Sequence, residues 1–347
     1  MAELTVGLAG FGRFARLHAR VLAGLPGVRI GAVCDAAPAA RERAAAELPG
    51  VPVHGSLDAM LDAGGLGALD VVTDETVHGA HALAGLEHGL PVFVEKPLAT
   101  SVEDALAVRD AARRSGLPVV VGYVSRFDHR YALVHAAIRA GRLGRVVAIS
   151  ARRGFSRTWF AGFGTRVHPV FESMIHDIDL ALWYLGAPVE TVVAHAHASD
   201  PGAPVPDVLA ALLRAGDGRL VTLQSHWLVP DGAARNLPAG DLDPLDLLGT
   251  IDAQLDVTGT KGTARIALDG GPRIETDAGV DASGGLWPAV HGAVTGPLRD
   301  ELAHFCDVAR RREPSALVPV EDAVAAVGVA DAIIRSSAAG TPVTVRC

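Results

Sequence analysis

The stretch LTVGLAGFGRFARLHARVLAGLP constrains the fold more than any other, because it joins an apolar strand to a helix through a glycine-rich turn. Gly10 permits a tight turn, Gly12 lets the backbone approach a pyrophosphate, and Ala15 keeps the helix close to the sheet. We therefore expect the amides from Phe11 to Phe14, with the helix dipole, to face the diphosphate of a dinucleotide. The turn matches the pattern G-x-G-x-x-G/A with Gly10, Phe11, Gly12, Arg13, Phe14 and Ala15.

A carboxylate at the end of the second expected strand, VRIGAVCD, supports this interpretation. Asp35 follows Ala15 by 20 residues, the spacing at which an acidic side chain accepts hydrogen bonds from the ribose hydroxyls. The same charge would repel a 2′-phosphate, so the sequence favours NAD over NADP as cofactor. The alternative is a glycine-rich turn followed by an acidic helix cap.

Strand-like and helix-like segments alternate through the first third of the chain, which predicts parallel strands with crossover helices on both faces. After a helix near RYALVHAAIRAGRLG the pattern changes to strands joined by short turns, which predicts a largely antiparallel open sheet. We expect an α/β Rossmann nucleotide-binding domain over residues 1–124 and an α+β domain for substrate binding and oligomerisation over 125–347. The expected strands of the second domain are RVVAISARRG, VETVVAHAHA, DVLAALLRAG, RLVTLQSHWLV, IDAQLDVTGT and KGTARIAL.

Composition narrows the class of partner. The chain has 347 residues, with 31 Lys and Arg against 39 Asp and Glu, giving a net charge of −8. Broad attraction to nucleic acid or to an anionic membrane is therefore not expected, and a small-molecule partner fits better. Three cysteines form no spaced framework, the first residues lack the features of a signal peptide, and no apolar run approaches the roughly 20 residues that span a bilayer. We expect a cytoplasmic protein.

The stretch VFVEKPLATS places a charged pair directly after an apolar strand. Pro97 biases Lys96 toward extended backbone, so the ammonium projects from a defined point at the end of the strand. That edge of an open α/β sheet is where ligands bind, and a cation there can hydrogen-bond a reacting hydroxyl and favour its alkoxide. The alternative is a strand end followed by a helix that Thr100 or Ser101 caps.

A second group of polar residues lies in HPVFESMIHDIDLALW. Glu172, His176 and Asp179 stand at i, i+4 and i+7, which places them on one face of a helix. Histidine, with an ordinary pKa of about 6.5, is suited to accept the proton of an alcohol that is being oxidised. Glu172 would then hold the tautomer and support the imidazolium, and Asp179 would orient or cap.

These motifs together resemble the family of glucose-fructose oxidoreductase, inositol dehydrogenase and the rhizopine-catabolism oxidoreductases, and the resemblance extends over essentially the whole chain. It implies an NAD-dependent dehydrogenase acting on a sugar, aminosugar or cyclitol, with Glu95 and Lys96 beside the nicotinamide and Arg126 near the cofactor or substrate. It also implies a cis bond between Lys96 and Pro97, and a homodimer or homotetramer paired through the antiparallel sheet. The motifs that carry it are AGFGRFARLHA, AVCD, TDETVHGAHALAGLEHG, EKPLA, VGYVSRFD, GRLG, IHDIDLALWYLG, VTGTKGTARI and GPLRDELAHF.

The sequence departs from the family pattern in three places. Glu172 stands where the family usually has aspartate, and the paired glycines that often precede this helix are replaced by RVHPVFE. TDETVH stands where the family commonly shows Thr-Pro. We include Thr73, Asp74 and His78 of this segment among the expected cofactor contacts, although the carboxylate of Asp74 has no clear role.

Three alternative functions remain open at this point. His168, Glu172 and His176 are spaced four apart and could ligate zinc, but Pro169 fits a first helical turn and places His168 at or before the cap, so we expect no metal. A group of arginines could bind the phosphate of a nucleotide sugar, although such arginines mostly pair with surface acids. A sensor that binds dinucleotide and sugar without turnover is the third. The arginines are Arg152, Arg153, Arg157 and Arg166.

Overall fold

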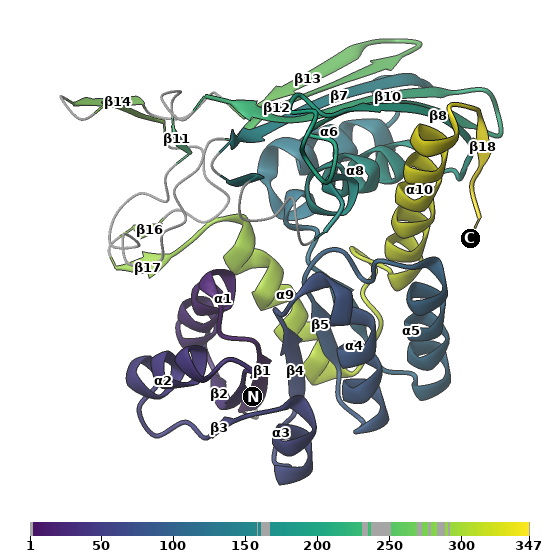
Figure 1. Cartoon of the computed structure of the whole chain (residues 1–347). Coiled ribbons are helices and arrows are strands. Elements are labelled where there is room, and N and C mark those ends of the chain that lie inside the picture. Colours follow the sequence, from purple (N-terminus) through teal and green to yellow (C-terminus); the bar gives the residue numbers. More distant parts are fainter. Residues whose placement is uncertain are drawn as a thin grey trace. The chain divides into compact units, whose positions relative to one another are not determined.

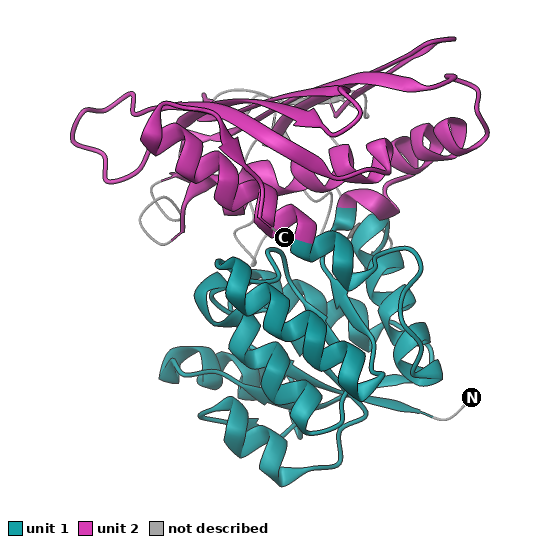
Figure 2. Cartoon of the chain, turned by 90° about the vertical axis from the view of Figure 1, so that its right-hand side faces the viewer, with its two compact units in different colours: residues 1–124, 240–247, 289–324 teal, residues 125–239, 248–288, 325–347 magenta. Residues whose placement is uncertain are grey.

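The computed structural model describes residues 3–157, 159–160, 167–230, 235–236, 251–268, 273–276, 279–282, 289–290 and 292–346 (Figure 1). The chain divides into two compact units, which Figure 2 distinguishes by colour. The described residues of the first unit fall within 3–124 and 289–324. Those of the second fall within 125–236, 251–282 and 325–346.

Six parallel strands form the sheet of the first unit in the order β3-β2-β1-β4-β5-β6. The direction of the strand order reverses between β1 and β4, and this switch point is where open α/β sheets bind ligands. The interior strands are largely apolar and are buried because crossover helices cover both faces. The expected Rossmann fold is confirmed. The strands are β1 (Leu4–Ala9), β2 (Val28–Cys34), β3 (Val53–His54), β4 (Ala68–Val71), β5 (Val92–Val94) and β6 (Val119–Val121).

The helices of this unit begin where the sequence provides caps. Ser101 Oγ accepts the amide of Asp104 at 3.1 Å at the start of α5, so Ser101 rather than Thr100 is the cap. Ser56 caps α3, a short helix that the sequence analysis did not predict. From the last third of the chain, α9 packs against α1. The elements are α1 (Arg13–Ala23), α2 (Pro38–Glu47), α3 (Leu57–Ala63), η1 (Glu75–Val77), α4 (His78–Glu87), α5 (Val102–Ser115) and α9 (Pro297–Arg311), with the hairpin β16 (Ala289–Val290) and β17 (Ala293–Val294).

A seven-stranded sheet forms the second unit, in the order β13-β12-β7-β10-β9-β8-β18. Its pairs are antiparallel except for β7 with β10, which run parallel. The expected, largely antiparallel sheet is therefore confirmed. Its strands are β7 (Val146–Ser156), β8 (Val189–His197), β9 (Val208–Ala215), β10 (Leu220–Val229), β12 (Ile251–Gly259), β13 (Thr263–Ala267) and β18 (Val343–Thr344), and a small sheet holds β11 (Arg235–Asn236), β14 (Arg273–Thr276) and β15 (Gly279–Ala282).

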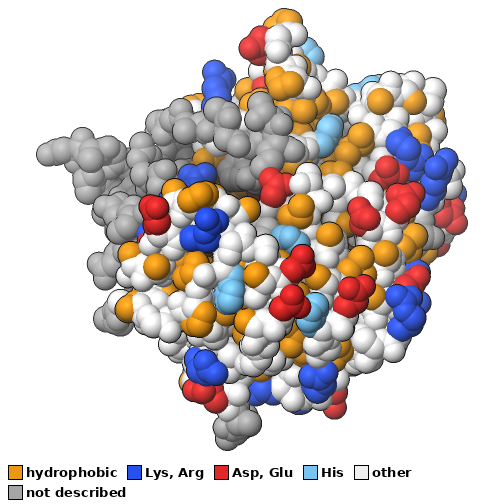
Figure 3. Space-filling model, turned by 60° about the horizontal axis from the view of Figure 1, so that its bottom comes forward, with side chains coloured by type: hydrophobic (Ala, Val, Ile, Leu, Met, Phe, Trp, Pro, Cys, Tyr) orange, Lys and Arg blue, Asp and Glu red, His pale blue; other side chains and the backbone are white. Residues whose placement is uncertain are grey.

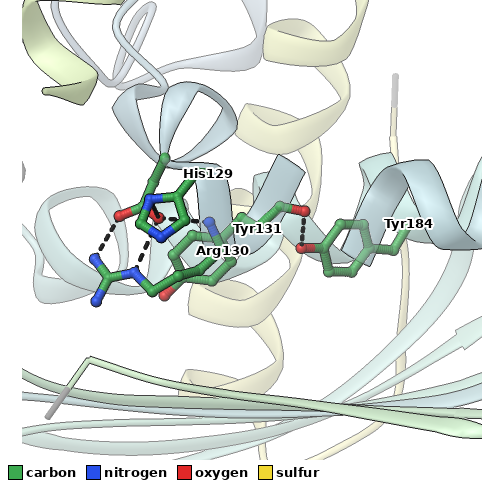
Figure 4. Close-up of polar contacts among 5 residues, drawn as sticks. His129, Arg130, Tyr131 and Tyr184 are labelled. Carbon is green, nitrogen blue, oxygen red and sulfur yellow. Dashed lines mark hydrogen bonds and ion pairs between the residues drawn. The ribbon is translucent and has the colours of Figure 1, made fainter. Parts of the chain in front are cut away.

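The two faces of this sheet differ. Alternate residues of β9 and β10, such as Leu213 and Leu223, are buried on the face that the helices cover in Figure 1, while their neighbours Leu212 and Thr222 are exposed. We call the second face the open face. Figure 4 shows one contact in the helical layer, where the Tyr184 hydroxyl donates to the Tyr131 carbonyl at 2.9 Å. The helices are η2 (Val124–Phe127), α6 (His129–Arg139), η3 (Val170–Met174), α8 (Ile175–Leu185) and α10 (Val320–Ala339).

Candidate functional site

The glycine-rich turn has the backbone that its sequence predicts. Gly10 has a φ of 93°, and a Cβ there would lie 2.2 Å from the Val72 carbonyl oxygen, so only glycine fits. A Cβ on Gly12 would meet nothing within 4 Å, and within the described residues no side chain caps α1 at that glycine. An open approach to a helix amino terminus suits a diphosphate, so the turn fits a dinucleotide.

Asp35 is held directly beside this turn. Its Oδ2 accepts the amide of Phe11 at 2.8 Å and its Oδ1 accepts the amide of Ala37 at 2.8 Å. In this structure the Phe11 amide therefore donates to the carboxylate, and the Phe11 side chain is buried. Contact of this amide with a diphosphate stays a prediction. A carboxylate oxygen can accept two hydrogen bonds, so each oxygen of Asp35 keeps the capacity to accept one from a ribose hydroxyl.

The carboxyl ends of the strands lie in register. Ala9 pairs with Cys34 on one side and with Val71 on the other, Val71 pairs with Val94, and Val94 pairs with Val121. The residues that follow these strand ends consequently share one edge of the sheet. They are Gly10, Asp35, Val72, Glu95 and Gly122, and Thr73 and Lys96 come directly after two of them.

Backbone contacts fix the segment that carries Lys96. The bond between Lys96 and Pro97 is cis, as the family resemblance implies. His78 is buried, and its Nδ1 lies 2.7 Å from the Pro97 carbonyl oxygen while its Nε2 lies 3.2 Å from that of Thr73. This imidazole therefore holds two segments of the sheet edge together. The Thr73 side chain lies 3.2 Å from Nδ1 of His81.

Asp74 has a local structural role that the sequence analysis did not assign. Its Oδ1 accepts the amide of Thr76 at 3.0 Å and the hydroxyl of Thr76 at 2.6 Å, so it caps η1. Whether Thr73, Asp74 and His78 also contact a cofactor stays a prediction.

Two further expected cofactor contacts lie at the start of α1, where Arg13 is exposed and Phe14 is half-buried.

In the second unit, Glu172 and His176 lie on consecutive turns of one continuous helical stretch. Its first turn, η3, is a π-helix, and α8 follows directly, whereas the sequence predicts an ordinary α-helix. Ser173 anchors the π-turn, because its hydroxyl donates to the Pro169 carbonyl at 2.8 Å and lies 2.7 Å from the hydroxyl of Ser225 on β10. Glu172 and His176 are half-buried while their neighbours are buried. Single π-turns occur frequently at functional sites.

Asp179, the third residue of this helix face, forms a buried ion pair. Both of its oxygens accept from the guanidinium of Arg126, at 3.0 and 2.6 Å, and both side chains are almost fully buried. The same guanidinium lies 5.3 Å from the centre of the Trp183 ring, which stacks on His135 at 3.8 Å. The structure thus joins Asp179 to Arg126, and the orienting role of Asp179 stays a prediction. Direct contact of either residue with cofactor or substrate stays a prediction.

The contacts weigh against the alternative roles. Arg153 is buried in an ion pair with Asp177, and Arg152 pairs with Asp252. Both arginines therefore pair with acidic side chains, which weighs against a phosphate site. Arg157 is exposed and Arg166 lies outside the described residues. Burial lowers the pKa of His168 to about 4, and its Nδ1 accepts the amide of Val170 at 3.3 Å, so it sits at the start of η3. In the described part of the chain, no three His, Cys, Asp or Glu side chains are grouped to hold a metal ion, and no helix is both long and apolar enough to cross a membrane.

Two residues near the sheet edge were not found by sequence reasoning. His18 lies on the buried face of α1, and Asp70 lies inside β4, with Nδ1 and Oδ2 3.0 Å apart. The signal was present in the sequence. A histidine on the apolar stripe of FARLHARVL and an aspartate inside the apolar run ALDVV both require buried partners.

Comparison with known proteins gives a consistent result. The profile of an oxidoreductase family with an NAD-binding Rossmann fold, GFO/IDH/MocA, matches residues 4–123, and that of the GFO/IDH/MocA C-terminal domain matches residues 131–265. Inositol 2-dehydrogenase 1 of Saccharopolyspora erythraea is 30% identical over 98% of this chain and 96% of its own length. Inositol 2-dehydrogenase 2 of the same organism is 34% identical, but that match covers 55% of this chain and only 57% of the relative.

A solved structure agrees in fold. The crystal structure of scyllo-inositol dehydrogenase from Lactobacillus casei, with bound NAD(H) and scyllo-inositol, superposes with a TM-score of 0.82 at 19% identity, covering 99% of each chain. Family profiles match both units, and a relative at 30% identity matches nearly end to end. The chain therefore belongs to the GFO/IDH/MocA family of oxidoreductases, whose amino-terminal domain is an NAD-binding Rossmann fold.

Proposed function

We propose that this protein is an NAD-dependent dehydrogenase that interconverts a secondary alcohol and a ketone on a cyclitol or a related sugar or aminosugar. The observation that carries the proposal is the single sheet edge that holds the glycine-rich turn, Asp35 and Lys96. Relatives named inositol 2-dehydrogenase support a cyclitol as substrate. When bound at this edge, NAD supplies the acceptor for the hydride.

Lys96 is the group that we assign to the reacting oxygen. The chain contains only two lysines, Lys96 and Lys261, among its 31 Lys and Arg residues. An ammonium is a compact point charge with three donors, so it can follow a single oxygen as that oxygen gains negative charge, whereas a guanidinium presents a rigid fork. The presence of a lysine just after β5 in an arginine-rich chain supports a role that arginine does not fill.

His176 is the proposed proton acceptor. A neutral ring nitrogen would take the hydroxyl proton of the substrate during oxidation and return it during reduction. Glu172, one turn earlier on the same helical stretch, would support the imidazolium that forms. The anchored π-turn and the buried neighbours of both residues support this assignment, since a general base acts only from a held position.

The test is a spectrophotometric panel. Purified protein is incubated with NAD or NADP and with inositols, monosaccharides, aminosugars and nucleotide sugars, while the absorbance of reduced cofactor is followed. We expect turnover with NAD and at least one cyclitol or neutral sugar. Dinucleotide and sugar binding without reduced cofactor would instead support a sensor, and turnover confined to nucleotide sugars would restore the phosphate hypothesis.

We further propose that the protein works as a homodimer or homotetramer, without nucleic acid or membrane. Figure 3 shows acidic and basic side chains interspersed over one face of the molecule. On the open face of the second unit, Leu212 and Leu220 are 44% and 43% exposed, which supports pairing of that face with a second copy. Two buried free thiols, Cys34 and Cys306, support the cytoplasm as its compartment.

A further inference from the structure

A series of polar contacts crosses the interior of the first unit and ends at the backbone of Lys96. His18 places Nδ1 3.0 Å from Asp70 Oδ2 and Nε2 3.3 Å from Glu95 Oε1. Glu95 then accepts the amide of Lys96 through its other oxygen, Oε2, at 3.1 Å. One imidazole therefore connects a carboxylate inside β4 to the residue that precedes Lys96.

These contacts are buried and their charges are mutually compensating. His18 and Asp70 are 0% exposed and Glu95 is 7% exposed. Burial by itself lowers the pKa of His18, but Asp70 and Glu95 outweigh it and raise the pKa to about 10. A pKa of about 10 favours the imidazolium at neutral pH. Nδ1 lies within hydrogen-bond distance of Asp70, while Nε2 is in ion-pair contact with Glu95 without hydrogen-bond geometry. A buried cation between two anions is held firmly, because each charge would be costly to bury alone.

The surroundings are shaped to this arrangement. The ring centres of Phe14 and Phe93 lie 5.1 and 5.6 Å from that of His18. The imidazole therefore contacts apolar rings as well as the two carboxylates. A Cβ at Gly122 would lie 2.7 Å from Glu95 Oε1, so the absence of a side chain there leaves room for the Glu95 carboxylate. Burial raises the pKa of Asp70, against which the charge of His18 acts. Among the described residues, Cys306 on α9 also interacts with Asp70, and burial raises the pKa of that thiol to about 12, which keeps it neutral.

We propose that His18, held by Asp70, is a positioning residue for Lys96. It fixes the Glu95 carboxylate, and that carboxylate fixes the Lys96 amide at the point where the chain leaves β5. The role of Lys96 in chemistry rests on the proposed function, but the positioning itself is a property of the unliganded protein. Loss of the charge on His18 would release Glu95 and let the Lys96 backbone move.

Nuclear magnetic resonance tests the positioning without any substrate. Labelling with lysine that carries 15N at the α position marks only two backbone amides, those of Lys96 and Lys261. The variant Lys261→Arg then shows which resonance belongs to which residue. We expect Asp70→Asn and His18→Gln to shift the Lys96 amide resonance and leave that of Lys261 unchanged. His304→Gln is the matched control, because it removes a different partly buried imidazole of the same unit, one that bonds Ser315. Equal Lys96 shifts in the control and in the two variants would overturn the proposal.

The protonation of His18 is measured in the same way with ring-labelled histidine. We expect a doubly protonated ring throughout about pH 6 to 9, the range over which an ordinary histidine loses its proton. In Asp70→Asn the ring should lose its proton within that range, and the Lys96 amide should shift with the same midpoint. A ring that is neutral at pH 7 in the wild type would refute the imidazolium and the proposal with it.

Kinetics then connect the positioning to turnover. We expect Asp70→Asn to lower kcat on the order of 10²-fold, as misplacement by about 1 Å can, with little change in the Kd for NAD. Lowering the pH should restore part of that loss, because His18 regains its proton, whereas a purely structural defect would not recover. Unchanged kcat with only a lower unfolding temperature would show a structural role and overturn the proposal.

Two outcomes need separate readouts. If His18→Gln does not fold, Glu95→Gln replaces it, since glutamine keeps the shape and an acceptor for the Lys96 amide but removes the charge that His18 holds. We expect the Lys96 amide resonance of Glu95→Gln to differ from that of the wild type, and an unchanged resonance would count against the proposal.

If the wild type turns over no substrate, the proposed function fails, while the amide and ring measurements still decide the positioning.

Discussion

At the scale of single residues, Asp35 stabilises a turn and is the residue that we propose selects the cofactor. It accepts two backbone amides, those of Phe11 and Ala37, so its position is set before any ligand arrives. A carboxylate fixed in this way cannot easily swing aside to admit a 2′-phosphate. Two like charges at about 4 Å repel each other by about 1 to 4 kcal/mol, depending on screening.

We therefore expect a kcat/KM at least about tenfold higher with NAD than with NADP, since tenfold corresponds to about 1.4 kcal/mol. Asp35→Ser should narrow this preference mainly by improving NADP. It should also raise KM for NAD, because serine cannot hold both amides. The measurement is kcat/KM for each cofactor at saturating substrate, and equal values in the wild type would remove Asp35 from cofactor selection.

Lys96→Ala tests the assigned charge. The variant should fold and bind NAD, because the fixed backbone around residue 96 depends on Glu95 and His78 rather than on the ammonium. Removal of a group that stabilises developing charge costs about 10² to 10³ in kcat. Lys261→Ala, which alters the one other lysine, is the matched control and should keep wild-type turnover. Wild-type kcat in Lys96→Ala would exclude the lysine from the chemistry.

At the scale of elements, the start of η3 carries a histidine that the fold keeps neutral. His168 uses Nδ1 as an acceptor for the Val170 amide, and burial lowers its pKa from 6.5 to about 4. Between those two values the unfolded chain binds a proton that the folded protein refuses. The stability that results is fully present above about pH 6.5 and is lost as the pH falls toward 4.

We expect His168→Gln to reduce the acid sensitivity of the protein. The wild type should lose at most on the order of 3 kcal/mol through His168 across this window, and the variant should lose correspondingly less. Thermal unfolding midpoints at several pH values between 4 and 7 measure the effect. His195→Gln is the control, because it removes an exposed histidine of the same unit, and the His168→Gln curve should be the flatter of the two. Parallel curves for wild type and His168→Gln would refute the lowered pKa.

The sequence predicted those elements whose causes are local. Alternating apolar runs and turns indicated both sheets. The segment TSVED limited the cap of α5 to Thr100 or Ser101, and Ser101 is the cap. The π-turn could not be predicted, since it depends on Ser173 meeting Ser225, 52 residues away on β10. For the same reason helical spacing did not reveal Arg126 as the partner of Asp179, and the π-turn that contains Glu172 breaks the regular spacing from which one shared face was predicted. The contacts of His18 with two separate strands lie beyond local pattern altogether.

At the scale of the whole molecule, the difference between the two sheets matters most. The parallel sheet of the first unit is buried on both faces by its crossover helices, and the edge at the carboxyl ends of its strands is the proposed ligand site. The antiparallel sheet of the second unit has helices on one face only, among the described residues. Its open face carries polar residues around a few large apolar ones. Exposed apolar side chains on this open face predict that it contacts a second copy of the chain.

Leu212 provides the test of that contact. It lies opposite Thr222 on β10 and Val193 on β8, near the middle of the open face. In a twofold interface each substitution occurs twice, so two glutamates in place of Leu212 would bring like charges into the contact. We expect light scattering at micromolar concentration to show a dimer or tetramer for the wild type, and Leu212→Glu to weaken association by at least about tenfold, or about 1.4 kcal/mol. Leu133→Glu is the matched control, because Leu133 is more exposed, at 66%, but lies on α6. A monomeric wild type would contradict pairing, and an equal effect of the two substitutions would move the contact away from the open face.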